Sequence, residues 1–352
     1  MALQPSGVFF ENYSHDKALI KTKYQWLSLA IFGIFLLLVP FLFGPRVIAV
    51  ANIMIIMAVV AVGLQITTGY AGQINLGQAA FMGVGAYTAG LVAIQFSLPF
   101  WLSIPLGGVA AAAFGYIFGL SAVRIKGFYL ALTTIAAQFI FHFAILNLPT
   151  SWFGGSNGLT LDPASLFGFE FKTDSSFYYL ALLICAIMVI GAFGIVRSRY
   201  GRAFVAVRDD DVASSMMGIN VVATKASAFL VGAFFAGIGG GLWAYYVRFV
   251  SVDQFTLFNS VWFVAMIIVG GSGSIVGALI GVFLIRSINE LVTSIGPVVS
   301  EAFPFIGGDI VFAAMNIILG GVICLFVIYE PKGLMYRWNI MKTSYRIWPF
   351  PH

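Results

Sequence analysis

The feature that most constrains this chain is a series of long apolar runs, each about as long as a helix that crosses a lipid bilayer. The first two, 25–44 and 47–66, are separated only by Pro45 and Arg46. A span needs about 20 apolar residues, because a helix rises about 1.5 Å per residue. Charged residues make up 9% of the chain, against roughly 25% in ordinary soluble domains. The sequence therefore predicts an all-α, polytopic membrane protein.

The apolar runs predict about ten membrane spans. They cover 25–44, 47–66, 76–95, 100–123, 128–148, 177–196, 226–247, 258–285, 287–305 and 310–329. The ambiguous segment is 287–305, because its polar and proline residues make it weakly apolar. If it crosses, Arg286 and most other basic residues face the cytoplasm, as the positive-inside rule requires, and both termini are cytoplasmic. The basic residues left outside are Arg46, Lys172 and Arg248.

The polar segments divide the chain into three parts. We expect a cytoplasmic N-terminal segment at 1–24, a transmembrane domain at 25–330 and a cytoplasmic tail at 331–352. In this topology the longest basic loop, 197–225, also faces the cytoplasm. The polar excursion 149–176 then lies on the opposite side of the membrane.

One uncharged stretch, 67–90, combines small residues with amides and is flanked by aromatic residues. Glycine and alanine at this density let helices approach backbone to backbone in lipid. Tyr70, Gln73, Asn75 and Gln78 lie within the stretch. Amides at membrane depth are tolerated where they face protein or a wet cavity, so the stretch predicts a broken or re-entrant helix that lines a pathway. The alternative is that the amides only connect neighbouring helices.

A second glycine-rich break, 269–281, lies in the other half of the chain. Broken segments in both halves predict two loosely related halves that form a pathway near the midplane of the membrane. Breaks at unrelated depths would contradict this repeat hypothesis. The glycines expected to pack helices closely or to break them are Gly69, Gly72, Gly77, Gly270, Gly271, Gly273 and Gly277.

The sequence argues against several classes of catalytic or metal site. It contains no G-x-x-x-x-G-K-[ST] phosphate loop, so the chain does not bind ATP by that motif. Its histidines, His15, His142 and His352, are too far apart in sequence for a metal-binding pair. A secondary transporter or channel would need intramembrane ion sites, and an intramembrane enzyme would need a nucleophile with a base. We find neither pattern, and we expect no catalytic residue, metal or cofactor.

The loop 197–225 has the composition of a docking element. Its core, 205–217, favours a short amphipathic helix with an acidic triplet, 209–211, near the middle. Gly218 follows, where the end of a helix favours a left-handed residue. Charge of both signs on such a helix predicts contact with a soluble partner. An ordinary solvated loop is the alternative interpretation.

Three motifs, taken together, resemble the LivM-type permease subunit of branched-chain amino acid ABC importers. They are GYAGQINLGQAAFMGVGAYTAG, GRAFVAVRDDDVASSMMGINVVATK and VGGSGSIVGALIG, in this order. The resemblance covers about 45–335. Permeases of urea importers are similar but typically have His where this chain has Gln78, which favours amino acids. A urea or other small-solute importer remains the alternative, and a stand-alone secondary transporter is a further one.

The resemblance implies a non-catalytic import subunit in the plasma (inner) membrane of a bacterium or archaeon. Its partners would be a second homologous permease, two cytoplasmic ABC ATPases and an extracytoplasmic amino-acid-binding protein, with no nucleic acid. ATP hydrolysis is expected in the partner chains. The expected substrate pathway is Tyr70, Gln73, Asn75 and Gln78, because neutral amides suit a zwitterion with an aliphatic side chain.

The resemblance also suggests which residues connect to the ATPases. The segment 212–218 is similar to the coupling signature of such permeases. Val212 stands where the family usually has an acidic residue, which leaves Asp210 or Asp211 for that role. The implied coupling residues are Arg202, Arg208, Asp210, Asp211, Ala213, Ser214 and Gly218.

Overall fold

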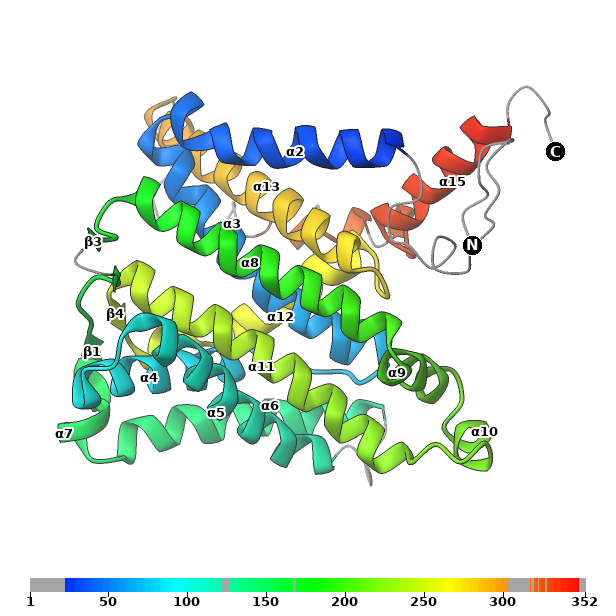
Figure 1. Ribbon diagram of the computed structural model, residues 1–352, viewed down its shortest axis with the longest axis horizontal. Coiled ribbons are helices and arrows are strands. Elements are labelled where there is room, and N and C mark those ends of the chain that lie inside the picture. Colours follow the sequence, from blue (N-terminus) through cyan, green and yellow to red (C-terminus); the bar gives the residue numbers. More distant parts are fainter. Residues whose placement is uncertain are drawn as a thin grey trace.

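The computed structural model describes residues 23–121, 127–166, 169–302, 317, 320–321, 323–326 and 328–347. In this part of the chain the fold is a bundle of long helices (Figure 1). The described residues contain nine helices that are long and apolar enough to cross a membrane. The predicted all-α, polytopic membrane class is therefore confirmed.

The long helices follow one another with short connections. They are α2 (Lys23–Leu42), α3 (Pro45–Leu64) with its π-helical extension η1 (Gln65–Tyr70), α4 (Gln78–Phe96), α5 (Phe100–Ser121), α6 (Phe128–Asn147), α8 (Asp174–Arg197), α11 (Val221–Val247), α12 (Leu257–Gly270) and α13 (Ile275–Ala302). The short elements are α7 (Thr150–Phe153), η2 (Gly155–Asn157), β1 (Leu159–Thr160), β2 (Ser165–Leu166), β3 (Phe169–Glu170), α9 (Arg199–Asp209), α10 (Asp211–Met216), β4 (Phe249–Val250), η3 (Val252–Gln254) and α15 (Leu334–Ile347).

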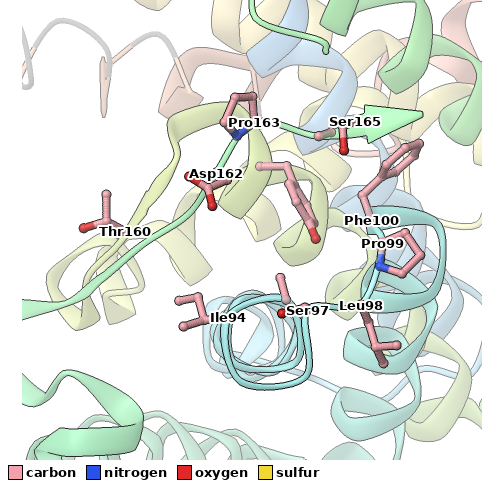
Figure 2. Close-up of a pocket in the computed structure, with 12 residues that line it drawn as sticks. Ile94, Ser97, Leu98, Pro99, Phe100, Thr160, Asp162, Pro163 and Ser165 are labelled. Atoms are coloured by element: carbon pink, nitrogen blue, oxygen red, sulfur yellow. The ribbon is translucent and has the colours of Figure 1, made fainter. Parts of the chain in front are cut away.

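The two ends of the bundle carry different structures (Figure 1). One end, on the right in the figure, carries α9, α10 and α15. The other carries α7 and the short strands, and we call it the strand end. There β1 pairs antiparallel with β4, which joins the excursion after α6 to the chain that follows α11. A cavity of about 440 Å³ lies at the strand end, between the turn from α4 to α5 and the segment 160–165 (Figure 2).

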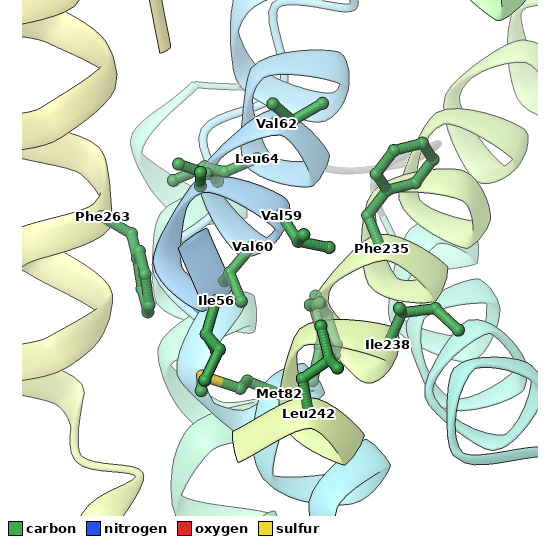
Figure 3. Close-up of a cluster of buried hydrophobic side chains, with 14 of the residues drawn as sticks. Ile56, Val59, Val60, Val62, Leu64, Met82, Phe235, Ile238, Leu242 and Phe263 are labelled. Atoms are coloured by element: carbon green, nitrogen blue, oxygen red, sulfur yellow. The ribbon is translucent and has the colours of Figure 1, made fainter. Parts of the chain in front are cut away.

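The core of the bundle is centred on α3 and α11. Figure 3 shows α3 between α11 and α12, with Ile56, Val60 and Leu64 directed into the cluster. Leu242 of α11 and Phe263 of α12 are buried against the same cluster. Apolar side chains on several sides of α3 are therefore enclosed by protein, which agrees with an apolar run that has no polar face.

Three helices approach one another backbone to backbone at glycines. A methyl group added to Gly85 of α4 would lie 2.3 Å from the Cα of Gly237 in α11. One added to Gly107 of α5 would lie 2.5 Å from the carbonyl oxygen of Gly85, and one on Gly237 would lie 2.8 Å from that of Gly107. The three helices α4, α5 and α11 therefore form one closely packed group in which a side chain has no room.

The sequence interpretation of the segment 258–305 was wrong in its boundaries. The predicted span 258–285 is two helices, α12 and α13, separated at Gly271 and Gly273, which have φ values of 116° and 83°. The helix α13 then continues without interruption to Ala302, so 287–305 is not a separate span. Glycine accepts these left-handed conformations at no steric cost, which explains why the helix ends there.

The placement of Arg286 also differs from the prediction. It was counted among the cytoplasmic basic residues, but it lies within the membrane-spanning part of α13, about 16 Å from the start of that helix at about 1.5 Å per residue. Further along α13, Glu290 pairs with Arg46 at the start of α3, with 2.7 Å between the nitrogen and oxygen. Thus α13 runs toward the strand end.

The last predicted span, 310–329, falls mostly outside the described residues. Its described residues, 317, 320–321, 323–326 and 328–329, are helical. The helix α15 lies at the opposite end of the bundle from the end of α13 (Figure 1). The predicted N-terminal segment 1–24 also lies outside the described residues, apart from the first two residues of α2.

We predict that Gly85→Ala destabilises the protein. Its methyl group would overlap the backbone of α11, which cannot move aside, and overpacking of this kind costs about 1–3 kcal/mol. The measurement is the thermal unfolding midpoint of the purified protein in detergent. Gly191→Ala on α8 is the matched control, because nothing lies within 4 Å of that position. Equal midpoints for the two variants would contradict the close-packing argument.

Candidate functional site

The predicted broken segment is present between α3 and α4. The π-helical η1 ends at Tyr70, and Gly72, with φ 67°, turns the chain. Residues 71–77 are not helical, and α4 begins only at Gln78. The Gln78 amide donates to the carbonyl oxygen of Val60 at 2.9 Å. Val60 precedes Tyr70 by about 15 Å of helix, so the segment runs back into the bundle before α4 starts.

The three predicted amides lie together in this segment, and all are buried. Asn75 Nδ2 donates to Gln78 Oε1 at 2.9 Å, while Asn75 Oδ1 accepts the backbone N–H of Gly77 at 2.9 Å. Gln78 Nε2 also lies 3.5 Å from the carbonyl oxygen of Gly232 on α11. Gln73 Nε2 donates to the carbonyl oxygen of Ala71 at 2.9 Å. These bonds join the segment to α3 and α11, and they are the helix connections that the alternative interpretation anticipated.

Two further side chains, which the sequence analysis did not identify, complete the start of α4. The backbone N–H of Leu76 donates to Thr134 Oγ1 of α6 at 2.9 Å, and that of Ala79 donates to Ser260 Oγ of α12 at 2.9 Å. Both hydroxyl residues are fully buried. In the sequence, Thr134 and Ser260 are recognisable only as small hydroxyl residues within apolar runs. Such a pattern does not indicate which helix the hydroxyl group contacts.

Tyr70 occupies a different position from the amides. It ends η1, is partly buried and packs against the main hydrophobic core. No hydrogen bond to Gln73, Asn75 or Gln78 is found for it among the described residues. The structure therefore brings Asn75 and Gln78 into direct contact and leaves Tyr70 nearer the end of the bundle that carries α9.

The two broken segments meet inside the bundle. Gln65 Nε2 of η1 donates to the carbonyl oxygen of Gly271 at 3.1 Å. A methyl group on Gly69 would lie 2.8 Å from the backbone nitrogen of Gly273. The two breaks thus lie at the same depth, so the condition that would have contradicted the repeat hypothesis is not met. The repeat itself stays a prediction.

The remaining glycines of the two breaks make close backbone contacts. A methyl group on Gly77 would lie 2.6 Å from the carbonyl oxygen of Thr134. One on Gly270 would lie 1.9 Å from the carbonyl oxygen of Gly277, so α12 and α13 cross at these two residues. Absence of a side chain at these positions is therefore a steric requirement of the turn and the crossing.

The cytoplasmic loop of the prediction forms two helices, not one. The expected helix 205–217 is interrupted at Asp210, where φ is −157° and ψ is 113°. Asp210 Oδ1 accepts the backbone N–H groups of Val212 at 2.8 Å and Ala213 at 3.0 Å, which makes it the N-cap of α10. Aspartate side chains compete with helical hydrogen bonds in this way, and this explains the break.

The other two acidic residues of the triplet make ion pairs. Asp209 pairs with Arg208 at 3.0 Å. Asp211 Oδ2 lies 2.7 Å from the Nζ of Lys225, which is 4% exposed. A buried lysine needs such a partner, so this pair fixes α10 to the start of α11.

Among the remaining predicted coupling residues, Ser214 is buried, whereas Ala213, Gly218 and Arg202 are exposed. Gly218 has φ 81°, and a methyl group there would meet open space within 4 Å. Arg202 Nη1 donates to the carbonyl oxygen of Arg197 at 3.2 Å. Gly218 therefore fulfils the conformational role that the sequence predicted for it, ending the helix in the left-handed region.

Arg208 connects α9 directly to the first break. Its Nη1 donates to the carbonyl oxygen of Gly69 at 3.0 Å. Its aliphatic stem lies against Gly72, where an added methyl group would be 2.5 Å from Arg208 Cγ. The sequence identified both partners separately, but 139 residues separate Arg208 from Gly69 and nothing in the pattern indicated the contact.

The helix α10 presents apolar side chains to its surroundings. Val212, Met216 and Met217 are 60%, 82% and 84% exposed. They lie at the end of the bundle, beyond the membrane-spanning helices (Figure 1). Apolar side chains exposed in this way are unusual outside the spans, since large exposed apolar patches occur mainly at sites of interaction.

Two cavities lie away from the amides. Figure 2 shows the larger one, where Ser97 and Asp162 face each other across the opening at the strand end. The smaller one, of about 190 Å³, lies between α3, α12 and α13 and is lined by Arg286 among apolar side chains. Neither cavity is lined by Tyr70, Gln73, Asn75 or Gln78.

The fold and the site together define a class, which is a multi-pass helical membrane protein with broken helices at its centre. The chain belongs to a family of permeases within that class. The model of the family described as "Branched-chain amino acid transport system / permease component" matches residues 46–328. No solved structure matches the chain.

Several relatives are similar to most of the chain. The LivM permease protein of the high-affinity branched-chain amino acid transport system of Escherichia coli (strain K12) is 29% identical over 320 residues, which are 84% of this chain and 71% of that protein. The corresponding BraD protein of Pseudomonas aeruginosa is 26% identical over 81% of this chain and 93% of its own length. The autoinducer 2 import permease LsrC of Enterobacter sp. (strain 638) is 25% identical over 75% of this chain and 76% of its own length.

We predict that Gln78→Leu lowers the thermal unfolding midpoint. The substitution leaves the carbonyl oxygen of Val60 and the amide of Asn75 without their partners, and a buried unsatisfied polar group costs about 1–3 kcal/mol. Gln95→Leu is the matched control on the same helix, because Gln95 is exposed. If both variants unfold at the same temperature, the amide bonds contribute nothing to the fold.

Proposed function

We propose that this chain is the transmembrane permease subunit of an ATP-driven importer for branched-chain amino acids and forms half of the translocation path. The observation that carries the proposal is the contact of Arg208 with Gly69 and Gly72, which connects an exposed helix pair to a broken segment in the membrane. Membership of the permease family and the names of the LivM and BraD relatives support the choice of solute.

The proposed partners are a second homologous permease, two cytoplasmic ABC ATPases and an extracytoplasmic amino-acid-binding protein. The chain itself is not an enzyme, and ATP hydrolysis takes place in the partner ATPases. The docking surface for an ATPase is α10, with Val212, Met216 and Met217. Methionine suits such a surface because its flexible side chain adapts to the partner.

The proposed location is the inner membrane of a bacterium or archaeon, with both termini in the cytoplasm. Basic residues concentrate at the end of the bundle that carries α9, α10 and α15, and the positive-inside rule assigns that end to the cytoplasm. In the described ranges the basic residues at the strand end are fewer: Arg46 at the start of α3, Lys172 after β3 and Arg248 at the end of α11. The strand end then faces the binding protein.

We propose that ATP binding moves α9 and α10 as one unit. The Asp211–Lys225 pair transmits this movement to α11, and Arg208 transmits it to the turn at Gly69. Two discrete arrangements of these contacts would give the outward-open and inward-open states, since packed helices shift between alternatives rather than deform continuously. Coupling in this scheme depends on Arg208 and Asp211 more directly than on Gly218.

The amides have a double role in this proposal. In the structure described here, Asn75 and Gln78 bond to each other and to α3, so the segment 71–77 is closed. When the turn at Gly69 moves, these amides and the nearby Gln73 and Tyr70 become available to the substrate. Neutral amides can bind both end groups of a zwitterion without an unbalanced charge.

We predict that Arg208→Met separates ATP hydrolysis from transport. The variant loses the bond to Gly69 but keeps a stem that can pack against Gly72. Coupling free energies of this kind correspond to about tenfold changes, so leucine uptake by the assembled importer should fall about tenfold while ATP hydrolysis persists. Arg337→Gln on the exposed surface of α15 is the control. Wild-type uptake by Arg208→Met would exclude this contact as the connection.

The function itself is tested with the complete importer in proteoliposomes. We predict uptake of labelled leucine that requires ATP, both ATPases and the binding protein, with isoleucine and valine as competitors. Urea and nucleosides serve as non-competing solutes. Sustained concentrative uptake by this chain alone, driven only by an ion gradient, would contradict the proposal.

A further inference from the structure

Arg286 is an arginine in the membrane-spanning part of α13 that the function proposed above does not use. It lies within the candidate span Ile275–Ile295, about 16 Å from the start of the helix and one turn before Glu290, which pairs with Arg46 at the strand end. Its neighbours in sequence, Val282 and Ile285, are 1% exposed and face the core. Arginine at this depth is rare in membrane proteins and commonly marks a functional site.

Among the residues that the structure describes, no hydrogen bond or ion pair to the guanidinium group of Arg286 is found. Its Nε is buried and makes no hydrogen bond. Glu290, one turn further along α13, is an acid that could reach it, but the Glu290 carboxylate pairs with Arg46 at 2.7 Å. Across the described ranges, Arg286 makes no ion pair with any residue. A cation in this position is stabilised only if a ligand or water supplies the missing acceptors.

The side chain lines the cavity of about 190 Å³ between α3, α12 and α13. The volume exceeds that of a single water, which occupies about 30 Å³ in the liquid. Met57, Trp262, Phe263 and Met266 supply apolar walls, and Asn259 and Asn289 lie at the same cavity. A cation, two amides and apolar walls together form a site for a small molecule with an anionic group and an aliphatic body.

We propose that this cavity is a subsite for the carboxylate of the transported amino acid, with Arg286 as the group that binds it. The proposal rests on the import function proposed above and adds the residue that recognises the substrate within the membrane. A guanidinium group offers a planar pair of N–H donors that matches the two oxygens of a carboxylate. The apolar walls then face the branched side chain.

The cavity lies next to the amides of the first break. Ser260 on α12 contacts the start of α4, whereas Asn259 and Phe263 on the same helix line the cavity. One helix therefore separates the carboxylate subsite from Asn75 and Gln78. Movement of α12 would affect the amide segment and the subsite together.

The first experiment compares Arg286→Gln and Arg286→Lys in the complete importer. We expect leucine uptake to fall about tenfold or more in Arg286→Gln, because the charge-assisted bond to the carboxylate is lost, and to fall less in Arg286→Lys. The surface variant Arg337→Gln should transport normally. Copurification of the second permease and of both ATPases shows whether each variant assembles.

Two results of this experiment would overturn the proposal. One is unchanged uptake per assembled complex in Arg286→Gln. The other is loss of the second permease from Arg286→Gln, which would show that Arg286 pairs with an acid of that subunit. If the wild-type importer itself transports no leucine, the proposed function fails instead, and the second experiment still tests the subsite.

The second experiment tests carboxylate recognition without transport. The complex in lipid nanodiscs, without the binding protein, is examined by saturation-transfer NMR with 4-methylpentanoate and with isopentylamine. These probes share the branched chain, but only the first carries a carboxylate. With 4-methylpentanoate, we expect a saturation-transfer signal from the wild type and from Arg337→Gln but none from Arg286→Gln. With isopentylamine, we expect no signal that depends on Arg286. Equal 4-methylpentanoate signals from wild type and Arg286→Gln would overturn the proposal.

Discussion

The close approach of α4, α5 and α11 is the contact on which the rest of the structure depends. In lipid, apolar side chains gain little by leaving their surroundings, so helices associate through van der Waals contact and interhelical hydrogen bonds. Gly85, Gly107 and Gly237 allow the backbones to meet. The contact holds α4 in a position where its first residue, Gln78, lies inside the bundle. The segment 71–77, which leads to Gln78, must therefore lie inside the bundle as well. The core cluster around α3 then packs against an already fixed group.

A broken helix inside a membrane protein raises a second requirement, which is a partner for every exposed backbone group. The segment 71–77 and the start of α4 meet it with side chains from three helices. Gln78 of α4 donates to the carbonyl oxygen of Val60, Thr134 of α6 accepts the backbone N–H of Leu76, and Ser260 of α12 accepts that of Ala79. Gln65 similarly bonds to Gly271 in the second break. Gln78, which suggests a pathway in the sequence, is therefore also one of the residues that make the irregular backbone possible, whereas Thr134, Ser260 and Gln65 contribute only to the backbone. In the proposed function, the hydrogen bonds of Asn75 and Gln78 stabilise the closed state and are exchanged for bonds to the substrate when the path opens.

The sequence predicted the spans up to residue 247 well because each depends on local length and apolarity, but it divided 258–305 in the wrong places. It also located the two breaks, since glycine and amide residues are concentrated there. It did not predict the contacts between Gln78 and Val60 or between Arg208 and Gly69, because the residues are joined through the fold and not through a pattern. The prediction of a single helix at 205–217 was wrong, because the chain breaks at Asp210, whose side chain caps a new helix, α10. Arg286 was misplaced because a lone arginine beside a weakly apolar segment looks like the end of a span.

The charged residues of α9 and α10 and the exposed apolar residues of α10 have different surroundings. The charges of α9 and α10 are engaged locally: Asp209 with Arg208, Asp211 with Lys225, and Asp210 with backbone N–H groups. The exposed part of α10 that remains is apolar, which suits protein contact better than solvent contact. Because Arg208 of α9 also binds Gly69, the coupling proposed above reaches a backbone carbonyl of the first break through one side chain. Arg286, by contrast, makes no such local ion pair among the described residues, and the proposed carboxylate subsite rests on this difference.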